Sequence, residues 1–276
     1  MSLRSSKILY VFLEVTDISR QRTFCEDIMG LKVIENQFHP PHERHGIVKY
    51  DAGDTILSLN LAGPRRLDPH TSDGIVTVFS TTKKRQAEIC TALSRYGYKP
   101  PEQPEGIFSD GDDHEYWLRP HSPVTDITSM RIEPIMQELC LKVEGLQRSL
   151  AFYADVLGLP LIEQNWETAT FATGNLRLVL QDGSSFGHQT PTRHNGYLTV
   201  FHTRELHKAC EELMKRGLQL RSRVRFTNIG GTVRFTDPTG HLFCLYEPSP
   251  DCLNWDSGSK VQEIMSSGPG TGSGHQ

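Results

Sequence analysis

Short segments in which every second residue is apolar recur along the chain. Residues 10–15 and 138–143 both have this alternation, which predicts strands with one buried face. Each segment is followed by apolar residues at helical spacing, over 19–29 and 146–157, and then by a glycine where a helix C-cap belongs. The pattern therefore predicts an α+β chain that repeats one order of strand and helix.

These segments belong to a longer internal repeat. Residues 138–143 follow residues 10–15 by 128 positions, and further blocks recur in the same order at similar spacing. The other matching pairs are 51–60 with 172–181, 74–81 with 196–203, and 108–110 with 235–237. Blocks that keep their order with small drifts in spacing predict an internal duplication.

The repeat divides the chain into two modules, which we expect at residues 1–125 and 130–250. Each module reads as two paired β-α-β units. Residues 251–276 end in a run of glycine and serine, and we expect a disordered tail there because such a segment buries little apolar surface.

Composition narrows the class of protein. The chain has 276 residues, 37% of them apolar, and a net charge of −4, which favours a packed core and gives no support to nucleic-acid binding. No apolar stretch approaches the roughly 18 residues of a membrane span. The six cysteines include no Cys-x-x-Cys pair, so we expect free thiols and a cytoplasmic location.

Three segments resemble the vicinal oxygen chelate superfamily, which includes glyoxalase I, extradiol dioxygenases, fosfomycin-modifying enzymes and bleomycin-binding proteins. They are residues 15–31, residues 143–159, and the closing segment Asp-Pro-Thr-Gly-His-Leu-Phe-Cys-Leu-Tyr at 237–246. The resemblance covers about residues 7–250. It implies two tandem βαβββ-type modules that form curled, cup-shaped mixed sheets with helices outside.

The resemblance also implies where a metal ion would be held. The family's ligands stand at the residue that opens the first strand of each module and seven residues after the aspartate of the closing motif. Here those positions carry Tyr10 and Glu138, and Trp117 and Cys244. Only Glu138 is a usual ligand in these enzymes, so we expect the ordinary metal centre to be absent.

Strand alternation gives an independent view of the same cup. It places aromatic and hydrogen-bonding side chains on one face, a mixture that suits a small-molecule pocket. The expected lining comprises Tyr10, Phe12, Trp117, Arg119, Glu138, Arg177, Cys244 and Tyr246, together with Cys140, Thr77, Phe79, Thr199 and Phe201. The alternative is an open, solvated sheet on which Glu138 pairs with Lys142 or Arg177.

Histidines are numerous but stand away from the expected ligand positions. His39, His42 and His45 lie in a proline-containing segment that only the first module has, and they are weak candidates for metal binding or for a pocket lid. His114 and His241 occupy matching turns, where we expect them to cap the turn. His202 is expected to point away from the cup.

Two functions remain open at this point, and so does whether the protein is an enzyme. The first is a small-molecule-binding protein without a metal, in which Tyr10, Phe12, Trp117 and Tyr246 pack on a partly aromatic ligand that Glu138, Arg119 and Arg177 orient. The alternative is a lyase or extradiol-type dioxygenase that holds Fe, Zn, Ni or Mn with divergent ligands. Glu138 would anchor that metal or act as a base, and Cys244, Tyr10 or the histidine segment would complete the site. In either case we expect a monomer or homodimer with a small-molecule ligand and neither nucleic acid nor membrane as partner.

Overall fold

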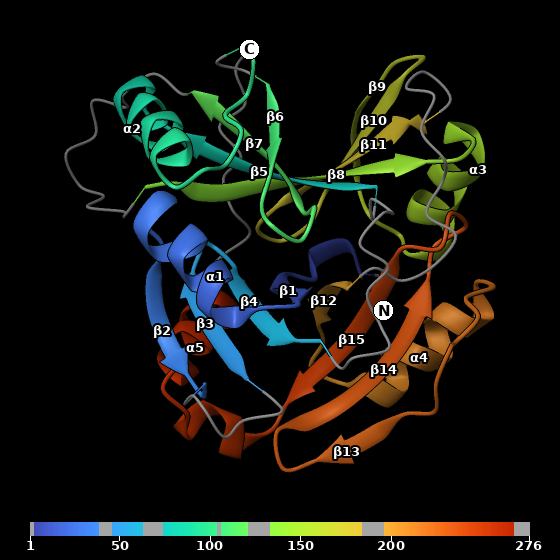
Figure 1. Cartoon of the computed structure of the whole chain (residues 1–276). Helices are drawn as coiled ribbons and strands as arrows, with labels where there is room; N and C mark the ends of the chain where they lie inside the picture. The colour runs from blue at the N-terminus through green and yellow to red at the C-terminus, as the bar shows by residue number, and fades with distance from the viewer. Residues whose placement is uncertain are drawn as a thin grey trace.

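The chain consists of four consecutive units, each with one strand, one helix and two or three further strands (Figure 1). The computed structural model describes residues 3–38, 46–62, 74–103, 106–120, 133–183 and 196–267. After a short 3-10 turn η1 (Leu3–Ser5), the first unit has β1 (Ile8–Val15), α1 (Ile18–Arg22) continued by the π-helical turn η2 (Thr23–Ile28), β2 (Lys32–Asn36), β3 (Ile47–Asp51) and β4 (Ile56–Leu61). The second has β5 (Ile75–Thr81), α2 (Lys83–Arg95), β6 (Ile107–Ser109) and β7 (Glu115–Pro120).

The third and fourth units repeat this order. The third has β8 (Ile135–Val143), α3 (Leu146–Ala151) continued by the π-helical turn η3 (Phe152–Val156), β9 (Leu161–Gln164), β10 (Thr168–Ala172) and β11 (Arg177–Asp182). The fourth has β12 (Tyr197–His202), α4 (Leu206–Lys215), β13 (Arg225–Thr227), β14 (Gly230–Thr236) and β15 (Leu242–Pro248). The predicted internal repeat is thus present in the fold.

The four units form two mixed sheets by crossing between the halves of the chain. The first sheet has the order β13-β14-β15-β12-β1-β4-β3-β2, and the second β6-β7-β5-β8-β11-β10-β9. The first sheet therefore joins units one and four through β1 and β12, and the second joins units two and three through β5 and β8. Each half of the sequence, 1–125 or 130–250, supplies one unit to each sheet, so neither half forms a sheet by itself.

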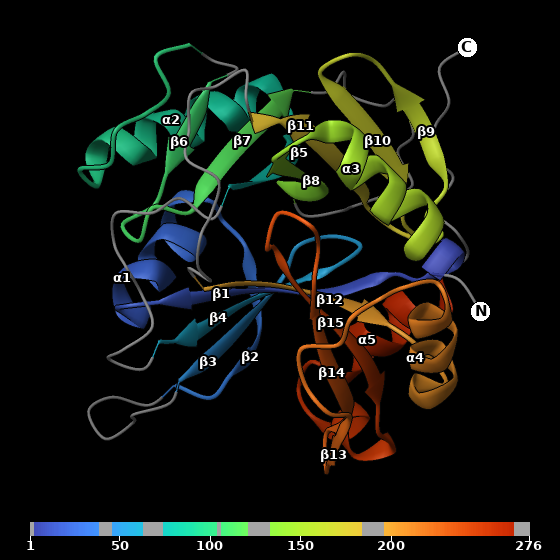
Figure 2. The same ribbon diagram turned by 90° about the vertical axis from the view of Figure 1, so that its right-hand side faces the viewer.

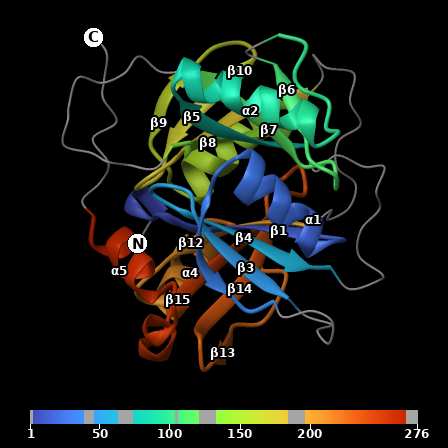
Figure 3. The ribbon, with the colours of Figure 1, turned by 60° about the vertical axis from the view of Figure 1, so that its left-hand side comes forward.

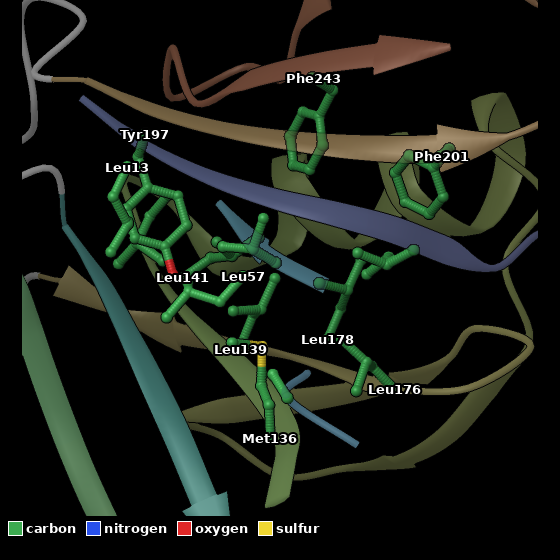
Figure 4. Close-up of a cluster of buried hydrophobic side chains, with 14 of the residues drawn as sticks. Leu13, Leu57, Met136, Leu139, Leu141, Leu176, Leu178, Tyr197, Phe201 and Phe243 are labelled. Carbon is green, nitrogen blue, oxygen red and sulfur yellow. The ribbon is translucent and has the colours of Figure 1, made fainter. Parts of the chain in front are cut away.

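The main hydrophobic core lies between the two sheets. Figure 2 shows the sheets stacked, with α1 and α3 between them. Leu13 and Leu57 of the first sheet face Leu139, Leu141 and Leu178 of the second (Figure 4). Because these residues occupy alternate positions of their strands, the opposite face of each sheet is left to the polar and aromatic set. The fold is the predicted α+β arrangement of curled sheets, and the helices α1 to α4 pack on the main core, outside the cups.

Local signals explain where the helices begin and end. The Asp17 side chain accepts a hydrogen bond from the backbone N–H of Arg20 at 3.0 Å, which caps the start of α1. Gly30 and Gly158 follow the first helix of each half with φ of +73° and +70°, a conformation that glycine adopts without a steric penalty. The predicted C-cap glycines are therefore confirmed.

The turn that precedes the last strand of each half is organised by a buried aspartate and histidine. Asp237 accepts hydrogen bonds from the backbone of Thr239, Gly240 and His241, from His241 Nδ1 at 2.8 Å and from the Tyr153 hydroxyl at 2.9 Å. Burial would raise the pKa of Asp237, but the charge and hydrogen bonds of His241 and the Tyr153 hydroxyl hold it below its usual value.

The equivalent turn of the first half is built in the same way. Asp110 accepts hydrogen bonds from the backbone of Asp112 and His114, from His114 Nδ1 at 2.9 Å and from the Tyr116 hydroxyl at 2.9 Å. His114 and His241 therefore hold these turns together, and the prediction that they cap the turns is confirmed.

The C-terminal segment differs from the expectation. Residues 251–276 were predicted to be disordered, but a 3-10 turn η5 (Pro250–Asn254) and a helix α5 (Gly258–Ser266) follow β15. Val261 and Ile264 of α5 are buried against the first sheet (Figure 3), and Lys7 Nζ donates to the Ile264 carbonyl at 2.5 Å. The apolar residues spaced through 253–265 account for the helix, and the Gly-rich run that suggested disorder begins only after it. Among the described residues, no helix combines the length and apolar character needed to cross a membrane.

Candidate functional site

Each sheet presents one face away from the main core, and these faces form two cups. We call the face of the first sheet that carries Tyr10 the first cup, and the face of the second sheet that carries Glu138 the second cup. One row of paired residues crosses each cup at equivalent positions. The row is Ile56, Tyr10, Val200 and Cys244 in the first cup, and Arg177, Glu138, Val78 and Trp117 in the second.

The structure therefore divides the predicted site between two places. Of its members, Tyr10, Phe12, Cys244 and Tyr246 belong to the first cup, and Glu138, Trp117, Arg119 and Arg177 belong to the second. Sequence alternation gives the correct face for all eight. It cannot give the pairing of units, which depends on how the halves cross.

Five further assignments were wrong. Phe79 and Phe201 belong to the main core, and Thr77 and Thr199 stand on the same faces of β5 and β12 as these two. The true inward residues of these strands are one position away, as Val78 and Val200 show. His202 pairs with Tyr246 and alternates with Val200, so it is on the cup face of β12. Both strands are buried on two faces, and their continuous apolar runs conceal which face is which.

The first cup contains a cavity of about 310 Å³. Its walls include Tyr10, Phe12 and Tyr246 from the sheet and Trp255 from the C-terminal segment. An adjoining cavity of about 290 Å³ shares Phe12, Asn60 and Arg234 with it. Aromatic walls with a few polar groups are typical of small-molecule sites.

Lys49, Arg234 and Trp255 are among the lining residues of this cavity that were missed from the sequence. Lys49 and Arg234 are charged residues between apolar neighbours in β3 and β14. A single charge in an apolar strand could have identified them in the sequence as candidate site residues. Arg234 is exposed, and no ion pair to its guanidinium is found among the described residues. Trp255 had no such signal, because its segment was expected to be disordered.

A buried ion pair closes one end of the first cup. Lys49 Nζ lies 2.9 Å from Glu35 Oε2 and 3.2 Å from Ser257 Oγ, which also donates to Glu35. The Lys49 ammonium stands 5.5 Å from the Tyr10 ring centre and 5.2 Å from that of Trp255. These cation–π contacts and hydrogen bonds fix the C-terminal segment over the cup.

The potential reactive groups of the first cup are protonated at neutral pH. Burial raises the pKa of Cys244 to about 11 and raises the pKa of Tyr10 and Tyr246 well above the usual value. At pH 7 the Cys244 side chain is therefore predominantly the neutral thiol. A thiol in this state is a weak nucleophile and a weak metal ligand.

The second cup is organised by charge. Glu138 Oε1 accepts a hydrogen bond from Arg119 Nη1 at 2.7 Å and lies 3.6 Å from Arg177 Nη1. The Arg119 guanidinium stands 4.5 Å from the Trp117 ring centre. Lys142 pairs with Glu115 at 2.7 Å instead of with Glu138. Burial raises the pKa of the neighbouring thiol of Cys140 to about 12. Cys140 and Cys244, which were both placed in the expected lining, lie in different cups.

The donor sets of the two cups do not fit a divalent metal ion. The first cup offers a protonated phenol and thiol, and the carboxylate of the second is in contact with two guanidinium groups whose charge opposes a cation. Within the described ranges, no group of three or more His, Cys, Asp or Glu could hold a metal ion. His39, His42 and His45 lie outside the described residues.

Comparison with known proteins agrees with this fold. Residues 132–245 match the family model described as Glyoxalase/Bleomycin resistance protein/Dioxygenase superfamily. Glyoxalase I from Zea mays is similar over 95% of this chain and 98% of its own, with 18% identity and a TM-score of 0.68. A putative dioxygenase from Bacillus subtilis covers 95% of this chain and 90% of its own, with 16% identity and a TM-score of 0.63. A search of the curated proteins finds no match.

The second half of the chain thus carries the sequence signature of the glyoxalase/bleomycin resistance/dioxygenase superfamily, and the whole chain has its two-module vicinal oxygen chelate fold. The predicted resemblance to this superfamily is confirmed over residues 132–245, and the predicted fold class is confirmed for the whole chain. At identities of 18% and 16%, the similarity to solved structures establishes the fold and leaves the chemistry to be argued from the cups.

Proposed function

We propose that this protein binds a small organic acid with an aromatic ring in the first cup, without a metal ion. The observation that carries the proposal is the cavity of about 310 Å³ between Tyr10, Phe12, Tyr246 and Trp255. These rings offer faces and edges on which a planar ligand packs. Arg234 at the rim supplies a planar, charged donor suited to a carboxylate.

Two features of the cup support binding over reaction. The only thiol in the equivalent metal-ligand row, Cys244, is buried with its pKa raised to about 11. The buried cation in the wall of the cavity, Lys49, is neutralised by Glu35 and serves to hold the C-terminal segment. Neither group is prepared to transfer a proton or attack a substrate at neutral pH.

The second candidate function is a metal-dependent lyase or extradiol-type dioxygenase. The family description names dioxygenases, and Glu138 stands at a position where the sequence resemblance implies a metal ligand. The contacts of Glu138 with Arg119 and Arg177 oppose that role, because the positive charges of the two guanidinium groups repel a divalent cation. We therefore assign Glu138 to an ion-pair cluster.

The test of the proposed function uses the three tryptophans as separate probes. Trp255 lines the first cup, Trp117 stands in the second, and Trp166 is 81% exposed. Benzoate, phenylacetate and 1-naphthoate are titrated into ¹⁵N-labelled protein, and the indole N–H signals are followed by NMR. Binding in the first cup shifts the Trp255 signal and leaves Trp166 unchanged. The variant Arg234→Ala weakens this binding, and Arg225→Ala, an exposed arginine of neighbouring β13, is the matched control.

Two results would contradict the proposed function. In one, none of the three aromatic acids moves the Trp255 signal. In the other, tag-free protein contains near-stoichiometric Fe, Zn, Ni or Mn that is lost on Glu138→Ala, which would favour the metal-dependent alternative.

A further inference from the structure

Two buried polar atoms in the second cup have no hydrogen-bond partner among the described residues. They are Glu138 Oε2 and Trp117 Nε1. The side chain of Glu138 is only 4% exposed, so bulk solvent has little access to it. Buried polar atoms are almost always paired in proteins, and an unpaired carboxylate oxygen is particularly costly. One spare acceptor and one spare donor therefore stand in the same row of β8, β5 and β7.

Two arginines add further spare donors beside this pair. Arg119 and Arg177 both direct Nη1 to the same atom, Glu138 Oε1, and their side chains are 41% and 46% exposed. A guanidinium carries five N–H groups, so most donors of both arginines remain available. The Trp117 ring against Arg119 restricts the plane of that guanidinium. The cluster has one carboxylate for two guanidinium groups and therefore keeps a net positive charge.

The surroundings of the cluster are apolar on one side and charge-balanced on the other. Val76, Val78, Cys140 and Val179 pack together beside Trp117. The next charged groups, Lys142 and Glu115, neutralise each other at 2.7 Å. The excess positive charge is therefore local to the two arginines, and a small ligand has an apolar surface for its carbon atoms.

We propose that the second cup is a separate binding site for a small carboxylic acid that bears a hydroxyl or amino donor on the adjacent carbon. The ligand's carboxylate accepts hydrogen bonds from Arg119, Arg177 and Trp117 Nε1, and its adjacent donor binds Glu138 Oε2. A simple anion satisfies the donors but leaves Glu138 Oε2 unpaired. The site thus selects acids that carry the adjacent donor. It lies in the other sheet from the aromatic cavity and does not depend on the function proposed there.

The experiment compares glycolate, glycine and acetate as probes in the same indole NMR titration. We expect glycolate or glycine to shift the Trp117 signal and to bind about tenfold more tightly than acetate, because a hydrogen bond to a buried charged group is gained. Whichever of the two binds more tightly identifies a hydroxyl or an amino group as the donor. Trp255 and Trp166 should not respond, so failure of this site is distinguishable from failure of the first cup.

Two variants test the assigned contacts. Arg177→Ala should weaken all three probes about tenfold, and Arg95→Ala, an exposed arginine of α2, should weaken none. Glu138→Gln should reduce the preference for glycolate or glycine over acetate. If that variant fails to fold, the Arg177→Ala comparison still decides. Each of three results would overturn the proposal. In the first, no probe moves the Trp117 signal. In the second, glycolate and glycine bind no more tightly than acetate, and in the third, Arg177→Ala leaves binding unchanged.

Discussion

The two cups occupy equivalent faces of the duplicated fold but differ in how charge is placed. In the first cup the buried pair Lys49 and Glu35, with side chains 8% and 2% exposed, holds the C-terminal segment over an aromatic cavity. In the second, Glu138 is equally buried, but its arginines are half-exposed. In the first cup, buried charges thus hold the C-terminal segment in place. In the second cup, the charged arginine side chains remain accessible to solvent.

The matching rows locate the origin of this difference. Tyr10 corresponds to Glu138, Ile56 to Arg177 and Cys244 to Trp117 across the repeat. Each exchange replaces an apolar or weakly polar group of the first cup by one with a strong hydrogen-bonding or ionic group in the second. Three side chains at fixed strand positions are therefore sufficient to change the ligand class that a cup suits, without changing its fold.

The largest effect is expected from removing the buried anion of the first cup. Glu35→Ala leaves the Lys49 ammonium buried and unpaired, and we expect the free energy of unfolding to fall by about 3–5 kcal/mol. Urea unfolding followed by circular dichroism measures the loss. The double variant Glu35→Leu/Lys49→Met removes both charges and should recover most of the stability. If the single and double variants are equally destabilised, the ion pair is not what holds the segment.

The sequence predicts the strands and helices well because alternation and glycine caps are local signals. Residues 19–29 and 146–157 contain the predicted helices, and Gly30 and Gly158 end them. The crossing of units is a non-local property, because the same alternation serves β1 whether it pairs with β5 or with β12. Tyr10 and Glu138 were therefore placed on the correct faces but assigned to a single cup.

The C-terminal segment was missed for a different physical reason. Its apolar residues, Leu253, Val261 and Ile264 among them, are too few to form a core by themselves. They become buried only against the first sheet, where Tyr10 and Cys244 provide the complementary surface. Composition near the chain end suggested disorder, and tertiary burial overrode it.

A smaller effect tests whether the two sheets depend equally on their aspartate turns. Asp237→Asn and Asp110→Asn should each lower the free energy of unfolding by about 2–3 kcal/mol at pH 7, because hydrogen bonds to a charged acceptor are lost. The pKa of both aspartates is lowered in the folded protein. Their contribution is therefore present above the unfolded pKa of about 3.9 and is lost as the pH falls through the folded value.

The contributions of Asp110 and Asp237 are measured from the pH dependence of stability. The urea midpoint of the unchanged protein should fall as the pH drops below about 4, because protonation of the two aspartates then removes their contribution to stability. Each asparagine variant should show a shallower decline than the unchanged protein. A decline as steep as that of the unchanged protein in either variant would mean that other carboxylates dominate acid unfolding.

Loss of a buried thiol should have a modest and similar effect in both cups. Cys244→Ala and Cys140→Ala are each expected to cost about 1 kcal/mol, the value for a small buried group. Burial raises the pKa of the two thiols to about 11 and about 12, so iodoacetamide should modify both slowly at pH 7 in the folded protein. Mass spectrometry of timed samples measures the rates. Rapid alkylation of Cys244 alone would instead indicate a reactive thiol in the first cup.

The smallest effect on stability is expected at the arginines of the second cup, which we propose bind the carboxylic acid. Arg177 is 46% exposed and 3.6 Å from Glu138, so Arg177→Ala should change the free energy of unfolding by less than about 0.5 kcal/mol. Arg119→Ala should cost more, about 1 kcal/mol, because the 2.7 Å bond and the Trp117 contact are both lost. Urea unfolding at low and high salt measures both variants. The expected result would mean that Arg177 stands beside the unpaired, buried Oε2 of Glu138 without stabilising the fold. A loss at Arg177 as large as that at Glu35 would instead make the second cup a structural ion-pair cluster like that of the first.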